Sequence, residues 1–72
     1  MERFLRYSLE KQRPIRLIYY ADDGKMKQVN AQITALAEQH VTFTSLRPKG
    51  IWTLPKERIL SADYKKGDEA QD

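Results

Sequence analysis

Few residues of this 72-residue chain could carry acid–base or metal chemistry. The one histidine, His40, has no compelling acidic partner in the sequence, and the chain contains no cysteine. Asp22 and Asp23 are adjacent carboxylates before Gly24, which is turn chemistry, and no calcium-loop spacing follows them. Phosphate-binding glycine loops and nucleophile elbows are also missing. We therefore expect a protein that is not an enzyme, with no catalytic residue, metal site or cofactor.

A second group of chemically useful side chains combines cations with aromatic rings. Small barrels bind single-stranded nucleic acid with such sets, because the rings stack on bases while the cations meet phosphates. The residues of this kind are Arg47, Lys49, Trp52, Arg58 and Tyr20. We predict a basic–aromatic surface on which the three cations face phosphate and the two rings offer stacking platforms. Its ligand would be single-stranded nucleic acid or a nucleotide-like anion.

Trp52 has a second interpretation. It alternates with Ile51 and Thr53, so either those two side chains face the core or Trp52 does, together with Leu54. A chain this short buries only about 60% of its unfolded surface, and a large inward ring would help to fill a thin core. We favour the inward orientation, which would make Trp52 a core residue rather than a stacking platform.

The segment from Lys25 to Ala35 alternates between apolar and polar residues, as a half-buried strand does. Its polar row consists of Gln28, Asn30, Gln32 and Thr34. Amides and hydroxyls can form hydrogen bonds with a ligand or a base edge. A solvated strand face has the same composition, and we favour that interpretation.

Charge and hydropathy limit the possible partners. Thirteen basic and ten acidic residues give a net charge of +3, a mild bias that suits an anionic partner but also an ordinary soluble surface, which we favour. The longest uncharged apolar run, from Leu17 to Ala21, is too short to span a bilayer. We expect a soluble cytoplasmic protein that does not bind membranes.

The periodicity of apolar residues predicts one domain, residues 1–64, built from a helix and five strands. The helix is expected at about 2–12, since the residue before Pro14 is disfavoured in helical conformation. The strands are expected at 15–20, 25–35, 41–46, 51–54 and 58–64, with one turn of 3₁₀ helix at 55–57. The polar residues 65–72 are expected to form a flexible tail.

Two apolar rows of the first two strands should form most of the core, with Val41 and Phe43 of the third strand. These rows are Ile15, Leu17 and Tyr19, and Val29, Ala31 and Ile33. Ile18 and Tyr20 face the other way and need a cover. We expect the helix to supply it through Phe4, Leu5 and Leu9, and a partner is the alternative.

One helix followed by five short strands indicates a mainly β fold, a strongly bent antiparallel barrel of the Sm-like or SH3-like kind. Closure of the sheet would remove its exposed edges. The alternative function is a protein–protein or self-association module without a ligand of its own, because a small domain with apolar residues on both faces of one strand gains stability by pairing. That alternative predicts a homodimer.

Four stretches of the chain resemble the Sm-like barrel of WYL domains and of the related YolD-like small bacterial proteins. They are the helix before RPIRLIYYADDG, the strand QVNAQITAL, the turn RPKG and the ending IWTLPKERILSAD. The resemblance covers residues 2–64 and departs on the third strand, which reads Val41-Thr42-Phe43 where the family has its Trp-Tyr-Leu tripeptide.

The resemblance implies a regulatory binding module. WYL domains usually follow a DNA-binding helix-turn-helix in bacterial transcriptional regulators and are thought to sense ligands, often nucleic acids or nucleotides. By position, Arg58 corresponds to the arginine of the family's closing Arg-Ile and Trp52 to its aromatic residue. Arg47 lies near the family's basic position after the third strand.

Overall fold

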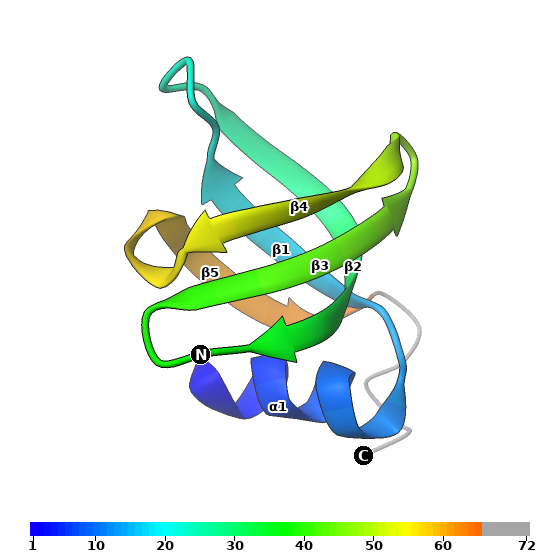
Figure 1. The fold of residues 1–72 in the computed structure, drawn as a ribbon. Coiled ribbons are helices and arrows are strands. Elements are labelled where there is room, and N and C mark those ends of the chain that lie inside the picture. Colours follow the sequence, from blue (N-terminus) through cyan, green and yellow to red (C-terminus); the bar gives the residue numbers. More distant parts are fainter. Residues whose placement is uncertain (66–72) are drawn as a thin grey trace.

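The computed structural model describes residues 1–65, so the predicted tail lies outside the described residues except for Lys65. One helix is followed by five strands (Figure 1). In chain order the elements are α1 (Glu2–Lys11), β1 (Ile15–Tyr20), β2 (Met26–Leu36), β3 (His40–Leu46), β4 (Lys49–Pro55), the 3₁₀ helix η1 (Lys56–Arg58) and β5 (Ile59–Tyr64). The predicted element order is confirmed. In residues 1–65 no helix has the length and apolar character needed to cross a membrane.

All five strands form one antiparallel sheet in the order β4-β3-β2-β1-β5. The strands β4 and β5 are thus opposite edges, although only the three residues of η1 separate them in the chain. The sheet has to curl until its edges meet at η1, as Figure 1 shows. No ladder joins β4 to β5 in the part of the chain that the structure describes. The predicted closure is therefore wrong: the sheet is bent but open, because η1 brings together only the ends of its edges.

The bend lies in β2, the longest strand. Residues 26–31 of β2 pair with β1, whereas residues 31–36 pair with β3, so that Ala31 has partners on both sides. The register with β3 shifts between Ile33 and Ala35, which leaves Thr34 as an extra residue. Such a bulge increases the local bend and twist of a strand. The prediction that this strand is long and bent is confirmed.

The core fills the concave side of the sheet. Every residue of the predicted inward rows is buried, and so are Val41, Phe43 and Leu54. The Phe43 ring is fully buried at the centre, with Tyr19 in an edge contact at 5.7 Å and Trp52 stacked on it at 5.6 Å. Trp52 is half-buried on the side of Leu54, while Ile51 is exposed. The inward orientation that the sequence favoured for Trp52 is confirmed.

The helix packs on the core side of the sheet. Leu5 is completely buried in the same apolar cluster as Ile15 and Ile33, and Phe4 and Leu9 pack against it. The predicted docking residues are therefore confirmed. The predicted cover for Ile18 and Tyr20 is wrong, because α1 extends the core instead and leaves Tyr20 exposed on the opposite face.

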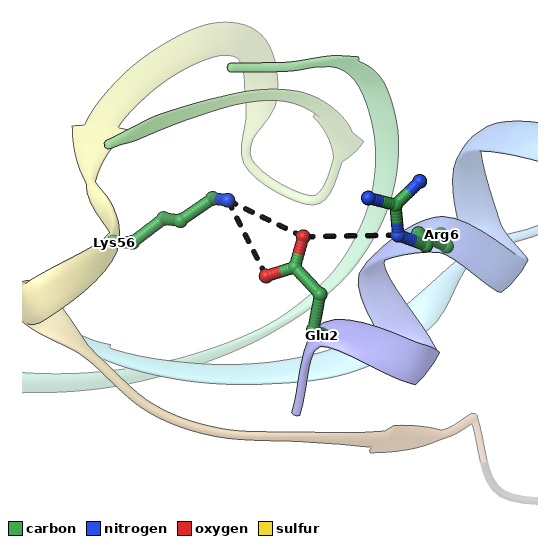
Figure 2. A network of polar contacts seen from close by, with 3 residues as sticks. All are labelled: Glu2, Arg6 and Lys56. Atoms are coloured by element: carbon green, nitrogen blue, oxygen red, sulfur yellow. Dashed lines mark hydrogen bonds and ion pairs between the residues drawn. The ribbon is translucent and has the colours of Figure 1, made fainter. Parts of the chain in front are cut away.

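Aromatic and ionic contacts hold α1 against the end of the sheet. The rings of Phe4 and Tyr7 each make an edge contact with Tyr64 of β5, at 4.9 and 5.2 Å. At the start of α1, Glu2 accepts hydrogen bonds from Lys56 Nζ to both carboxylate oxygens at 3.3 Å (Figure 2). The Nε atom of Arg6 lies 3.9 Å from the same carboxylate. Exposed ion pairs contribute little individually, so this network orients α1 more than it stabilises it.

Candidate binding groove

A groove of about 510 Å³ crosses the convex face of the sheet at the β3–β4 turn. It is lined by Pro14, Asn30, Gln32, Thr44, Ser45, Leu46, Arg47 and Lys65. We call these residues the β2–β3 groove. Its volume falls within the range of small-molecule sites, about 300–1,000 Å³. Pro14 directly precedes β1 and Lys65 directly follows β5. The start of β1, the end of β5 and the β3–β4 turn therefore all border the same groove.

The floor of the groove is polar and uncharged. Asn30 and Gln32 are two residues apart on β2, so their side chains project from the same face. Gln32 lies opposite Thr44 of β3, and the neighbouring pair is Ala31 with Ser45. The two amides and the Thr44 hydroxyl offer both donors and acceptors to a ligand. The sequence had favoured a plain solvated face for this row, and the structure places its middle two members inside a hollow.

Cations stand at the rim of the groove. Arg47 follows β3 directly, and its backbone N–H donates to Ser45 Oγ at 3.2 Å, which fixes the start of the turn. Lys49 lies opposite Leu46 in the β3–β4 ladder. No carboxylate among residues 1–65 forms an ion pair with the side chain of Arg47, Lys49 or Lys65. These three charges therefore remain available to an anion.

Arg58 lies at the other end of the molecule. Its guanidinium donates to the carboxylate of Asp22, in the turn between β1 and β2. Strand β4 separates Arg58 from Arg47, and seven residues of strand span about 20 Å. Tyr20 belongs to the same end, opposite Met26 beside that turn. The predicted surface is thus divided: Arg47 and Lys49 lie together at the β3–β4 turn, where Arg47 lines the groove, whereas Arg58 and Tyr20 lie far from it.

Trp52 belongs to neither end. Its ring lies over Gly50, where an added Cβ would meet the ring edge at 2.8 Å, and it stacks on Phe43 with an interplanar angle of 19°. A half-buried ring held between backbone and core offers little free surface to a base. The structure therefore brings only two of the five sequence-predicted residues together, Arg47 and Lys49.

Several groove residues were not predicted from the sequence. Lys65 had been assigned to a tail, Pro14 only to the end of the helix, and Thr44 and Leu46 to no binding role. One signal could have found Thr44: the alternation that places Val41 and Phe43 inward puts Thr44 on the convex face, beside the polar row of β2. Nothing local in the sequence reveals that Pro14 and Lys65 come together, since that contact depends on where β1 begins and β5 ends.

The groove is lined by two amides, two hydroxyls and two cations, together with Pro14 and Leu46. In residues 1–65 no three histidine, cysteine, aspartate or glutamate side chains gather where they could hold a metal ion. Burial in the core raises the pKa of the Tyr19 phenol, which lies outside the groove. What the groove offers is hydrogen bonding and positive charge. No family model, curated protein or solved structure matches the chain.

Proposed function

We propose that this protein is a small, non-enzymatic binding module for phosphate-bearing anions, with nucleic acid as the first candidate. The observation that carries the proposal is the β2–β3 groove, in which the uncharged side chains of Asn30, Gln32 and Thr44 lie beside Arg47 and Lys65, two cations without an ion pair within residues 1–65. Charge attracts a phosphate, and the amides hold the group attached to it.

A contrast with four other cations of the domain supports this assignment. Arg6, Arg16, Lys56 and Arg58 each face a carboxylate of the same chain. The partner carboxylate cancels part of the positive electrostatic potential around such a cation. Within residues 1–65 the cations at the groove lack that compensation, and Arg47 and Lys65 line a concave surface that a ligand could contact.

We also propose that the bent sheet is an open form of the Sm-like barrel, related to WYL domains and YolD-like proteins. The strand order and the single 3₁₀ turn between the two edge strands support this proposal. The regulatory role implied by that relationship agrees with a ligand-binding groove. A cytoplasmic location remains a proposal of the same kind.

The test is binding of a labelled single-stranded oligonucleotide and of inorganic polyphosphate, followed by fluorescence anisotropy as the salt concentration rises. Affinity should fall steeply with salt, because each neutralised phosphate releases counterions. Arg47→Ala should weaken binding and lower the salt slope. Lys25→Ala removes an equal charge from the distant β1–β2 turn and should change neither. Absence of binding of both anions at low salt would refute the proposal.

A second candidate function is self-association through β4. This edge strand has no strand on its outer side among residues 1–65, and Ile51 is 72% exposed on its convex face. An unpaired edge is a template for another strand, and a second copy of β4 could extend the sheet across a two-fold axis. Ile51→Lys should then shift a dimer towards monomer in sedimentation velocity. A wild-type protein that remains monomeric at high concentration excludes this candidate.

A further inference from the structure

We infer that the β2–β3 groove takes one unpaired nucleotide of a single strand, with Asn30 and Gln32 on the base edge and Arg47 and Lys65 on the phosphates on either side of it. This inference rests on the proposed function and specifies its ligand. It follows from which chemical groups lie where in the groove.

The two amides on the floor of the groove indicate that the ligand carries both hydrogen-bond donors and acceptors. Neighbouring amide side chains present a donor and an acceptor each, the complement of the mixed edges of nucleobases, whereas a bare phosphate offers only acceptors. A site for phosphate alone would have no use for the acceptor oxygens of Asn30 and Gln32. Their position on the floor between the two cations therefore indicates a ligand with a hydrogen-bonding ring beside its charge.

The two apolar residues of the groove, Pro14 and Leu46, suit a ligand with a flat ring. Pro14 is the residue next to Ile15, which lies opposite Ala31, so Pro14 comes beside Gln32 on the neighbouring strand. Leu46 is 83% exposed at the end of β3, an unusual position for a leucine. Both border the polar floor and offer apolar surface to the faces of a flat ring. Burial of that surface against a base favours binding, although less than an aromatic stack would.

The shape of the groove favours a single strand over a duplex. The amides belong to strand residues on the floor of the protein's groove. They cannot enter the major groove of a duplex, as a recognition helix does. A base can reach them only when it is unstacked and turned out of its helix, which costs least in a single strand. The inferred ligand is therefore a single strand, and its bases should not bind equally well.

The experiment compares short single-stranded homopolymers of the four bases, a duplex and polyphosphate, for the wild type and three variants. Asn30→Ala and Gln32→Ala should bring the affinities for the four homopolymers closer together, with about tenfold loss for the preferred base, since such contacts are worth about 1–3 kcal/mol. Gln28→Ala is the matched control, because Gln28 belongs to the same row of β2 but lies opposite Ile18, outside the groove.

The outcomes separate the inference from the proposed function. Oligonucleotide binding with the same base preference in Gln32→Ala, Asn30→Ala and Gln28→Ala would overturn the inference and leave anion binding intact. Equal affinity for duplex and single strand, or binding of polyphosphate without oligonucleotide, would do the same. Failure of every anion to bind would overturn both. A preference for one base that only the groove variants reduce would support both.

Discussion

The Oγ atom of Ser8, in α1, accepts a hydrogen bond from the backbone N–H of Ile33, in β2, at 2.9 Å. The same hydroxyl donates to the carbonyl oxygen of Arg13 at 2.6 Å. Because β1 begins opposite Ala31, no strand of the described chain covers this side of β2 beyond that point. A buried serine thus replaces the missing strand at the bend and joins the helix to the sheet.

Ser8→Ala should lower the free energy of unfolding by about 1–3 kcal/mol, because it leaves a buried N–H without its acceptor. Urea denaturation followed by circular dichroism measures the change. Ser61→Ala is the control, since it makes the same replacement at an exposed position of β5 and should cost less than about 0.5 kcal/mol. Equal losses in the two variants would contradict the role assigned to Ser8.

Gly50→Ala should destabilise the domain by about 1–3 kcal/mol through overpacking, since the new methyl group would lie 2.8 Å from the Trp52 ring. A double-mutant cycle with Trp52→Leu tests the cause. The cost of Gly50→Ala should largely disappear when the ring is gone, because the two residues are in contact. If the two substitutions add independently, Trp52 does not lie over Gly50 as described.

Tyr19 should make stability fall in alkaline solution. Burial raises the pKa of its phenol above the ordinary value of 10.0, so the folded state holds this proton more tightly than the unfolded state does. Its contribution is fully present below pH 10 and is lost as the pH rises through the higher folded pKa. Tyr19→Phe should flatten the decline of urea stability above pH 10. Tyr20→Phe, at an exposed neighbour, should retain the wild-type slope.

Arg58→Ala should leave oligonucleotide affinity within about twofold of the wild type, because its guanidinium faces Asp22 at the end of β4 away from the groove. Loss of this exposed pair should cost at most about 1 kcal/mol of stability. Fluorescence anisotropy and urea denaturation check the two expectations. A drop in affinity as large as that of Arg47→Ala would place the ligand at the β1–β2 turn instead.

The fold could largely be predicted from the sequence because its signals are local. Alternation identified Ile15, Leu17 and Tyr19 as inward residues, and Pro14 marked the end of the helix. Closure of the barrel and the side on which α1 docks could not be predicted in this way. Both depend on long-range geometry: η1 sets how the edges meet, and Ser8 seats α1 on the bend of β2.

The candidate site was less predictable than the fold. Residue type suggested that Arg58 belonged with Arg47, but the opposite ends of β4 hold them apart, and Asp22 neutralises one of them. Asn30 and Gln32 could not be told from a solvated face, because the hollow above them is formed by Pro14 and Lys65. Sequence shows which groups can bind a ligand, whereas the meeting of distant segments decides which of them act together.

The most direct test of the account is a titration of the ¹⁵N-labelled protein with single-stranded oligonucleotide, followed in two-dimensional NMR spectra. We predict that shift changes concentrate on the amides of Asn30 and Gln32, including their side-chain NH₂ signals, and on the backbone from Thr44 to Arg47. The signals of Asp22 and Arg58 should stay in place. Changes centred on Asp22 and Arg58, or none at low salt, would contradict the central claim.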